Sequence, residues 1–267
     1  MEDDLHVALS AALAGAAVGL EYFATVARLA REFKADGSVV TEADRAVEEA
    51  IRRVLAGARP LDAVLGEEAG QTGHGDRRWI IDPIDGTALF VAGDDRWLVL
   101  VALEEAGEVV AGVAVVPAQH RIWWAARGGG AFEAGFTGIT LIGERRITVD
   151  RGRPETLPGS RIGIVPTEET LVPDEREMIA PLRAETSVMP WRTHAALLVA
   201  CGELDLAVQT RGKVWDFAAT SLIVTEAGGR FSGLDGRQWP VSGPSLYARS
   251  TALHAAALHL MHRSASA

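Results

Sequence analysis

The hydrophobic and polar positions in the first part of the chain follow the period of a helix. Alanine, leucine and valine recur at three- and four-residue spacing over 4–33 without an intervening proline, which predicts one long helix. A second helix is predicted over 42–57, because Thr41 can cap its first turn and Asp44 can complete a capping box. The Asp-Gly pair at 36–37 predicts a turn between the two helices.

The middle of the chain changes to the period of two that strands produce. Short strands are predicted within 62–70 and within 79–86. Residues 97–126 predict three more strands separated by two short turns, and such short connections favour antiparallel neighbours. The glycine-rich stretch at 127–132 is interpreted as a turn and flexible link, and it lacks the spacing of a dinucleotide-binding loop.

Beyond about residue 150, strand and helix patterns alternate, which is typical of an α/β arrangement. Strands are predicted at 161–166 and 204–209, and helices at 175–184, 193–202 and 216–229. The change of pattern predicts two lobes, an N-terminal α+β lobe over 1–150 and a C-terminal α/β lobe over 151–267. Because no low-complexity linker separates them, we expect the lobes to share an interface and to bind the ligand in the cleft between them.

Composition and charge narrow the classes of function. The 267 residues are 48% hydrophobic and 23% charged, as in ordinary globular proteins. A net charge of −10 makes the chain a poor partner for nucleic acid, although a divalent cation could still mediate binding of a phosphate. The one cysteine, Cys201, cannot form an intramolecular disulfide, which fits a cytoplasmic location.

The apolar N-terminal segment lacks the features of a targeting sequence. Its first charges are acidic, whereas a signal peptide carries basic ones. His6 and Glu21 limit the apolar run, which is therefore expected to be too short to span a bilayer. We expect a helix of a soluble protein here, and no membrane partner.

The stretch WIIDPIDGT at 79–87 ends an apolar strand in two carboxylates and a hydroxyl. Pro83 fixes its own φ and favours an extended Asp82, and Gly86 permits a tight reversal. Asp82 and Asp85 can then face one small volume. Two such anions repel each other, and a hard divalent cation such as Mg²⁺, Mn²⁺ or Ca²⁺ removes that repulsion.

Each acidic stretch also has an ordinary interpretation. Asp and Gly beside a strand are common in plain turns, and an isolated Glu67-Glu68 pair is usually solvated surface. Asp216 follows a Trp at a predicted helix start, where an Asp is usually a cap. The occurrence of all these stretches in one order is what indicates a metal site.

These stretches resemble the inositol monophosphatase family of metal-dependent phosphomonoesterases. The resemblance covers most of the chain and rests on DGSVVTEAD (36–44), GEEAG (66–70), WIIDPIDGT (79–87) and WDFAATSLIVTEAGG (215–229). It implies an α+β or α/β fold, a layered αβαβα sandwich, with the active site between the lobes. It also implies a homodimer and sensitivity to Li⁺.

The resemblance further implies a site for about two to three Mg²⁺ ions, with Mn²⁺ as a substitute. The implied metal ligands are Glu67, Asp82, the backbone carbonyl of Ile84, Asp85 and Asp216. The implied catalytic residues are Asp44, Glu67 and Thr87, of which Asp44 and Thr87 orient and help to deprotonate the attacking water. The implied phosphate- or substrate-binding residues include Gly86, Thr87 and Asp216.

The residue types suit hydrolysis by water. Metal ions can neutralise phosphate oxygens, lower the pKa of a bound water and stabilise the leaving alkoxide. No nucleophilic Ser or Cys is needed, so no phosphoenzyme is expected. Thr87 can pass a hydrogen bond from the water to Asp44, and backbone N–H groups at the Asp-Gly-Thr turn suit an anion.

The expected substrate pocket departs from the family pattern. The stretch that contacts substrate in inositol-phosphate enzymes aligns here with Pro-Trp-Arg-Thr at 190–193. The Glu that those enzymes place before the Trp-Asp pair aligns with Gln209. Residues 121–132 and 227–237 instead resemble the family's histidinol-phosphate phosphatases, although strand packing explains the Trp pair at 123–124 as well.

The residues of this pocket are open to more than one interpretation. Trp191 can stack on a flat substrate ring, or it can be a partly buried interface residue. Arg192 can meet a substrate anion, or it can pair with Glu185 or another surface acid. His194 adjoins this stretch and is the histidine most worth testing, whereas the histidines within 251–263 fit a surface helix.

Three functions remain open. The first is Mg²⁺-dependent hydrolysis of a small phosphate monoester, either histidinol phosphate or a cyclitol or sugar phosphate such as inositol monophosphate. The second is a nucleotide phosphatase acting on a nucleoside monophosphate or on 3′-phosphoadenosine 5′-phosphate, which a stacking role for Trp191 would favour. The third is a family member without turnover that serves as a binding or scaffold protein, and the complete set of acids and Thr87 argues against it.

Overall fold

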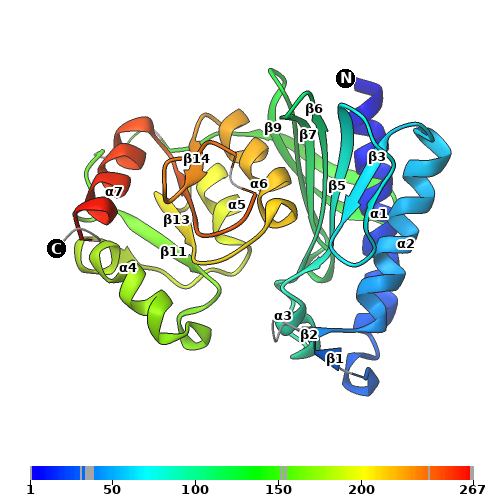
Figure 1. Ribbon diagram of the computed structural model, residues 1–267, viewed down its shortest axis with the longest axis horizontal. Helices are drawn as coiled ribbons and strands as arrows, with labels where there is room; N and C mark the ends of the chain where they lie inside the picture. Colours follow the sequence, from blue (N-terminus) through cyan, green and yellow to red (C-terminus); the bar gives the residue numbers. More distant parts are fainter. Residues whose placement is uncertain are drawn as a thin grey trace. The chain divides into compact units, whose positions relative to one another are not determined.

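Two units, each with its own sheet and buried core, make up the part of the chain that the computed structural model describes: residues 2–30, 32–33, 39–150, 152, 155–239 and 241–264 (Figure 1). Unit 1 comprises Met1–Arg146 and Ala218–Ile223, and unit 2 comprises Ile147–Phe217 and Val224–Ala267. The turn predicted at 36–37 lies outside the described residues, as does the first part of the 36–44 motif.

Unit 1 is built on an eight-stranded sheet with the order β10-β9-β8-β7-β6-β5-β3-β4. Its strands are β3 (Ala63–Gly66), β4 (Gly70–Thr72), β5 (Arg77–Asp85), β6 (Leu98–Glu105), β7 (Glu108–Val116), β8 (Arg121–Ala126), β9 (Gly130–Thr137) and β10 (Thr140–Ile147). Strands β3 and β5 run parallel, whereas β6, β7 and β8 are antiparallel neighbours. The three antiparallel strands predicted over 97–126 are therefore confirmed.

The turn predicted at the glycine-rich stretch 127–132 is present between β8 and β9. There, Gly128 and Gly130 adopt φ angles of 73° and 86° that side-chain-bearing residues rarely accept. Strand β10 follows at the edge of the sheet with most of its side chains exposed. Its Gly-Glu-Arg-Arg centre carries no apolar alternation, which is why the sequence pattern gave no strand there.

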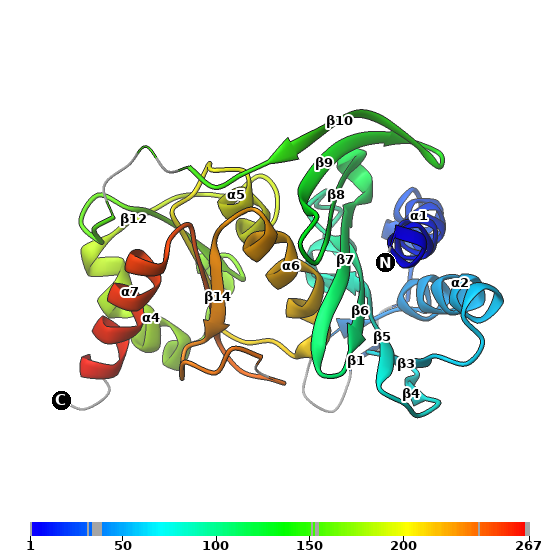
Figure 2. The same ribbon diagram turned by 90° about the horizontal axis from the view of Figure 1, so that it is seen from above.

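Helices α1 (Glu2–Phe23) and α2 (Glu42–Ala58) cover one face of this sheet (Figure 2). The two helices approach closely because Gly15 has no side chain, since a Cβ there would lie 2.8 Å from Ile51 Cγ1. Helix α2 matches the prediction over 42–57 and adds one residue. On the sheet itself, the Ala218–Ile223 part of helix α6 (Val214–Glu226) packs on β7, where a Cβ at Gly112 would lie 3.0 Å from the Ala219 backbone.

The helix predicted over 4–33 ends earlier, at Phe23. Thr25 closes the last turn, because its N–H and its hydroxyl both donate to the Tyr22 carbonyl, at 3.0 and 3.3 Å. Farther on, β1 (Glu32–Phe33) pairs antiparallel with β2 (Val39–Val40). Residues 32–33 of the predicted helix thus form a strand with a second segment, and the sequence of the first segment alone does not show this partner.

By length and composition, α1 is able to cross a membrane, because Asp3–Phe23 spans 21 residues with a mean hydropathy of 1.4. The expectation that this run is too short is therefore wrong. Its packing is that of a core helix: Ala8, Ala11 and Ala16 have no exposed surface and belong to the buried cluster of unit 1.

Unit 2 is built on a five-stranded mixed sheet with the order β12-β11-β13-β15-β14. Its strands are β11 (Arg161–Val165), β12 (Ser187–Val188), β13 (Leu206–Gln209), β14 (Arg230–Gly233) and β15 (Ser245–Ala248), and its other helices are α4 (Pro173–Glu185), α5 (Ala195–Ala200) and α7 (Thr251–Ser264). Strand β11 runs parallel to β12 and β13, while β15 runs antiparallel to β13 and β14. The strands and helices predicted beyond residue 150 are present, and β12, β14 and β15 are additional.

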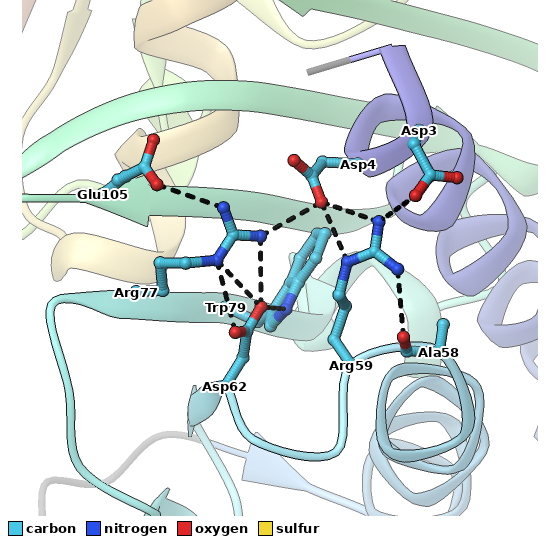
Figure 3. A network of polar contacts seen from close by, with 8 residues as sticks. All are labelled: Asp3, Asp4, Ala58, Arg59, Asp62, Arg77, Trp79 and Glu105. Atoms are coloured by element: carbon cyan, nitrogen blue, oxygen red, sulfur yellow. Dashed lines mark hydrogen bonds and ion pairs between the residues drawn. The ribbon is translucent and has the colours of Figure 1, made fainter.

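A polar network joins α1, the segment after α2 and strand β5 (Figure 3). Arg77 donates from Nη2 to Asp4 Oδ1 at 3.0 Å and from Nε to Asp62 Oδ1 at 3.2 Å. Trp79 lies beside it with no exposed surface and donates from Nε1 to Asp62 Oδ2 at 3.0 Å. The Asp62 carboxylate therefore accepts hydrogen bonds from both the Arg77 guanidinium and the buried Trp79 indole.

We expect Asp62→Ala to lower the free energy of unfolding by about 1–3 kcal/mol, because it leaves the buried Trp79 N–H without this acceptor. Asp62→Asn keeps an oxygen acceptor and should cost less. Urea unfolding measures both effects. Glu49→Gln is the control, since Glu49 and Arg53 form a pair in which both side chains are 74% exposed, and it should change stability by less than about 0.5 kcal/mol. An Asp62→Ala protein as stable as this control would contradict the role of the network.

Candidate metal centre

A bulge in β5 brings Asp82 and Asp85 to the same side of the strand. Side chains alternate along a regular strand, so two residues three positions apart point to opposite faces. Here Asp82 is opposite Leu100 of β6 and Asp85 is opposite Leu98, so β5 holds one residue more than β6 between these pairs. The extra residue restores a common face, and a carboxylate oxygen of each aspartate lies within 4.8 Å of the other.

Pro83 explains why the bulge forms at this point. Proline has no N–H to donate to the neighbouring strand, so a bulge at Pro83 loses fewer strand-to-strand hydrogen bonds than a bulge at another residue would. Asp82 is 1% exposed and Ile84 is 1% exposed, whereas Asp85 is half-buried. The strand thus presents two carboxylates and the Ile84 carbonyl within four consecutive residues, and all three groups offer oxygen atoms that can coordinate a metal ion.

Glu67 is placed beside Asp82 by the register of the parallel strands β3 and β5. Gly66, the last residue of β3, is the partner of Ile81, and the Glu67 N–H donates to the Ile81 carbonyl at 3.3 Å. The residues that follow this pair are Glu67, in the turn after β3, and Asp82 of β5. The backbone of Glu67, which the sequence could place only by resemblance, therefore lies next to that of Asp82 within unit 1.

Gly86 ends β5 and begins the short helix α3 (Thr87–Val91). It has a φ of 84° and a ψ of 41°, in the left-handed region that glycine accepts without strain. The Thr87 hydroxyl then lies 3.0 Å from both Asp44 Oδ1 and the Ile84 carbonyl. Its single proton can serve only one of these acceptors at a time, and an ionised carboxylate is the stronger one.

Asp44 is fixed at the start of α2 by the capping box that the sequence predicted. Both the N–H and the hydroxyl of Thr41 donate to Asp44 Oδ2 at 2.8 Å, and Ala43 N–H donates to the Thr41 hydroxyl at 3.1 Å. Burial raises the pKa of Asp44 above its ordinary value, while the hydrogen bonds from Thr41 and Thr87 act in the opposite direction. One carboxylate oxygen is thus committed to the cap and the other faces Thr87.

Asp216 lies in the first turn of α6 and is described with unit 2. Its Oδ2 accepts the Lys213 N–H at 2.6 Å, so Asp216 caps the helix from its third position and is not the N-cap residue that the ordinary interpretation expects. As with Asp44, capping uses one oxygen of the carboxylate. The cap therefore does not prevent the other oxygen from acting as a ligand.

The residues expected at the substrate pocket belong to unit 2 and are largely buried or paired. Trp191 is 6% exposed, and its Nε1 donates to the Ile164 carbonyl at 2.7 Å, which favours a packing role over stacking on a substrate. Arg192 pairs with Glu203 at 2.6 Å, rather than with Glu185. Gln209 is 4% exposed at the end of β13.

His194 caps the short helix α5 from a buried position. Its Nδ1 accepts the Ala196 N–H at 3.3 Å, and its side chain belongs to a residue that is 3% exposed. Burial lowers the pKa of His194 to about 4, so the ring is neutral near pH 7. A neutral, buried cap is a structural role, which the neighbouring sequence alone did not reveal.

Two tryptophans of β8 also have a packing role. Trp123 is fully buried and Trp124 is 4% exposed, and Trp124 stacks on Phe132 with ring centroids 5.9 Å apart.

One residue of unit 1 that the sequence did not single out is Glu48, a carboxylate that is 1% exposed on α2. Its position one turn after Asp44 on the same helix face was a signal that could have found it.

Comparison with known proteins adds an independent finding. Residues 1–266 match the inositol monophosphatase family. A histidinol-phosphatase of Streptomyces coelicolor is 40% identical over 90% of this chain and 90% of its own, and an inositol-1-monophosphatase of Mesorhizobium japonicum is 34% identical over 98% of this chain and 97% of its own. The solved structure of an IMPase from Thermotoga maritima has a TM-score of 0.80 at 25% identity and covers 99% of this chain and 98% of that one. The fold class predicted from the sequence is confirmed.

Replacing His194 should flatten the dependence of stability on acid pH. Its pKa is 6.5 in the ordinary state and about 4 when folded, so between these values the unfolded chain binds a proton that the folded chain does not. The free energy of unfolding therefore decreases as the pH falls through this window, by about 3 kcal/mol in total from this residue.

Urea unfolding near pH 7.5 and near pH 4.5 measures this loss in the wild type and in His194→Asn, which keeps an oxygen to cap α5. The control is His120→Asn, because His120 is exposed and has a φ of 52° that Asn tolerates. The loss should shrink in His194→Asn and not in His120→Asn. An unchanged pH dependence in His194→Asn would show that this ring is not held neutral.

Proposed function

The chain belongs to the inositol monophosphatase family, and on that basis we propose that it is a Mg²⁺-dependent enzyme that hydrolyses a small-molecule phosphate monoester with a metal-activated water. Family and relatives identify it as a phosphatase, a phosphoric monoester hydrolase. The observation that carries the metal-dependent part is the bulge of β5, which holds the carboxylates of Asp82 and Asp85 within 4.8 Å of each other.

The donor set of unit 1 fits a hard divalent cation. The proposed ligands there are Glu67, Asp82, the Ile84 carbonyl and Asp85, all of which offer oxygen. Mg²⁺ and Mn²⁺ prefer such oxygen ligands, and a cation offsets the repulsion between carboxylates at this distance. We propose that Asp216 is a further ligand and that the site takes about two to three ions, with Mn²⁺ as a substitute.

When bound, the metal would neutralise phosphate oxygens, activate water and stabilise the leaving alkoxide. The residues of the chain would orient the water and hold the phosphate. The Thr87 hydroxyl donates to Asp44, so the lone pairs of its Oγ are available to accept a hydrogen bond from water and orient it. We propose that the backbone amides of Gly86 and Thr87, at the left-handed turn before α3, hold the phosphate.

The substrate that we favour is histidinol phosphate or a cyclitol or sugar phosphate such as inositol monophosphate. Support comes from the relatives, of which the histidinol-phosphatase is 40% identical and the inositol-1-monophosphatase 34% identical. The nucleotide-phosphatase alternative relied on Trp191 as a stacking platform, and the hydrogen bond from its Nε1 to Ile164 holds that ring in the interior instead. The scaffold alternative gives no reason for two carboxylates to crowd at the bulge.

The proposal extends to the setting of the enzyme. We propose a homodimer by analogy with the family, and a cytoplasmic location because the sequence has a single cysteine, Cys201, which fits a reducing compartment. Nucleic acid and membrane lipids are not among the proposed partners, because the net charge of −10 opposes both anionic surfaces.

Phosphate release should require Mg²⁺, stop with EDTA and fall with millimolar Li⁺. Asp85→Asn should lower the rate by more than the roughly 10–100-fold that the loss of a supporting contact costs, because it removes a ligand itself. The matched control is Asp95→Asn, since Asp95 is exposed, accepts a hydrogen bond from Gln119 Nε2 at 3.3 Å and is not among the proposed ligands. Near-normal turnover by Asp85→Asn would refute its assignment to a metal.

A substrate panel tests the specificity. We expect kcat/KM for histidinol phosphate or for inositol 1-phosphate to exceed that for adenosine monophosphate at least tenfold, which corresponds to about 1.4 kcal/mol of transition-state binding. Phosphate release at saturating Mg²⁺ gives the values. A nucleotide as the best substrate would replace the proposed specificity while leaving the metal-dependent chemistry in place.

A further inference from the structure

The carboxylate of Glu48 is buried on the sheet side of α2, one helical turn after Asp44. Burying a carboxylate is costly unless it is paired and hydrogen-bonded, so such a residue calls for a physical reason. Helix α2 and strand β3 lie side by side in both views (Figures 1 and 2), and the contacts of Glu48 lead to the turn that follows β3.

Glu48 accepts two consecutive backbone N–H groups of that turn. Its Oε2 accepts from Glu68 N at 2.8 Å, and its Oε1 accepts from Ala69 N at 3.1 Å. Both are hydrogen bonds to an ionised acceptor, which are about twice as strong as neutral ones. The two amides come directly after Glu67, the proposed metal ligand.

Arg52 completes this contact from the next turn of α2. Its Nε donates to Glu48 Oε1 at 2.7 Å, which satisfies the buried charge. Its Nη2 donates to the Gly70 carbonyl at 2.6 Å, and its Nη1 donates to the Thr72 hydroxyl at 3.0 Å. The Glu48–Arg52 pair thus binds two amides of the turn after β3 and two polar groups of β4.

The Glu48 carboxylate lies very close to the backbone at Gly66, the last residue of β3. A Cβ added there would lie 2.2 Å from Glu48 Oε1 and 2.4 Å from its Cδ, so the carboxylate packs directly on the backbone of the turn. On the other side, Glu67 N–H is held by the Ile81 carbonyl of β5. The backbone of Glu67 is therefore fixed both before and after the residue.

We propose that Glu48 is a positioning residue of the metal centre: it holds the turn so that the Glu67 carboxylate is preorganised as a ligand. This inference rests on the proposed function, in which Glu67 binds metal. Groups that orient a ligand typically change metal affinity 10–100-fold when they are removed. The same helix also orients Thr87 through Asp44, so α2 sets the positions of two turns of the centre at once.

The test is Mn²⁺ binding by electron paramagnetic resonance in Glu48→Gln. The amide keeps one oxygen acceptor but turns an NH₂ group toward a donor, so one of the three bonds to the carboxylate becomes repulsive. We expect the Mn²⁺ Kd and the Mg²⁺ concentration for half-maximal activity to rise about 10–100-fold. The kcat at saturating Mg²⁺ should change much less, and the amides of Glu68 and Ala69 should exchange hydrogen faster.

The matched control is Glu49→Gln, the same substitution one residue along the same helix. Glu49 pairs with Arg53 at an i,i+4 spacing like that of Glu48 and Arg52, but on the exposed face. It should leave the Mn²⁺ Kd unchanged. If Glu48→Gln does not fold, as judged by its thermal unfolding, Arg52→Gln takes its place, because it keeps the carboxylate and should shift the Kd in the same direction by less.

A double-mutant cycle with Glu67→Ala separates positioning from general stability. On the Glu67→Ala background, Glu48→Gln should no longer change the Mn²⁺ Kd, because the ligand that it orients is gone. Equal effects on both backgrounds, or a folded Glu48→Gln protein with wild-type Mn²⁺ affinity, would overturn the positioning role alone. A wild type that neither binds Mn²⁺ nor releases phosphate with Mg²⁺ would overturn the proposed function, and the positioning role with it.

Discussion

The candidate centre depends on one extra residue in strand β5. Without it, Asp82 and Asp85 would point to opposite faces of the sheet, because residues three positions apart alternate. The bulge opposite Leu98–Leu100 places them together and gathers negative charge at a partly buried position. The bulge interrupts the hydrogen bonding between β5 and β6, which is mildly unfavourable in itself. In return it brings two carboxylates together, and a bound cation can relieve the repulsion between them.

The second constraint is the rigidity of α2. Its apolar side chains Val47, Ile51 and Leu55 have no exposed surface and anchor it to the core of unit 1. Its polar residues at the same end, Asp44 and Glu48, contact two separate turns that flank the bulge. Because these contacts come from one capped helix, the two turns cannot shift independently of each other, which is the kind of support that a preorganised site needs.

Local features of the structure could be predicted from the sequence, and distant ones could not. The capping box of Thr41 and Asp44 depends on residues three positions apart, so its signal lies within one stretch. The strand Glu32–Phe33, inside the stretch predicted as helix, depends on pairing with β2, and the Trp191 side chain depends on a hydrogen bond to Ile164 of β11. Propensity and spacing contain no information about such partners.

The same distinction applies to the site. The acids on β5 were recognisable because they follow an apolar strand with a proline and a glycine at fixed places. Glu48 had only the weaker signal of its position one turn after Asp44, because a Glu within an amphipathic helix looks like any solvent-facing residue until the fold buries it. The parallel register of β3 and β5, which brings Glu67 next to Asp82, is likewise a property of the sheet and not of either strand.

The contact between Gly66 and Glu48 links the fates of two positions that are 18 residues apart. Gly66 has no left-handed φ, so its backbone would accept an ordinary amino acid, and only the neighbouring carboxylate excludes one. A larger residue at 66 thus becomes acceptable only after 48 has become smaller, while a smaller residue at 48 leaves two amides without their acceptor. The two positions are therefore energetically coupled, and an engineer who wishes to remodel this turn does best to change both of them in one step.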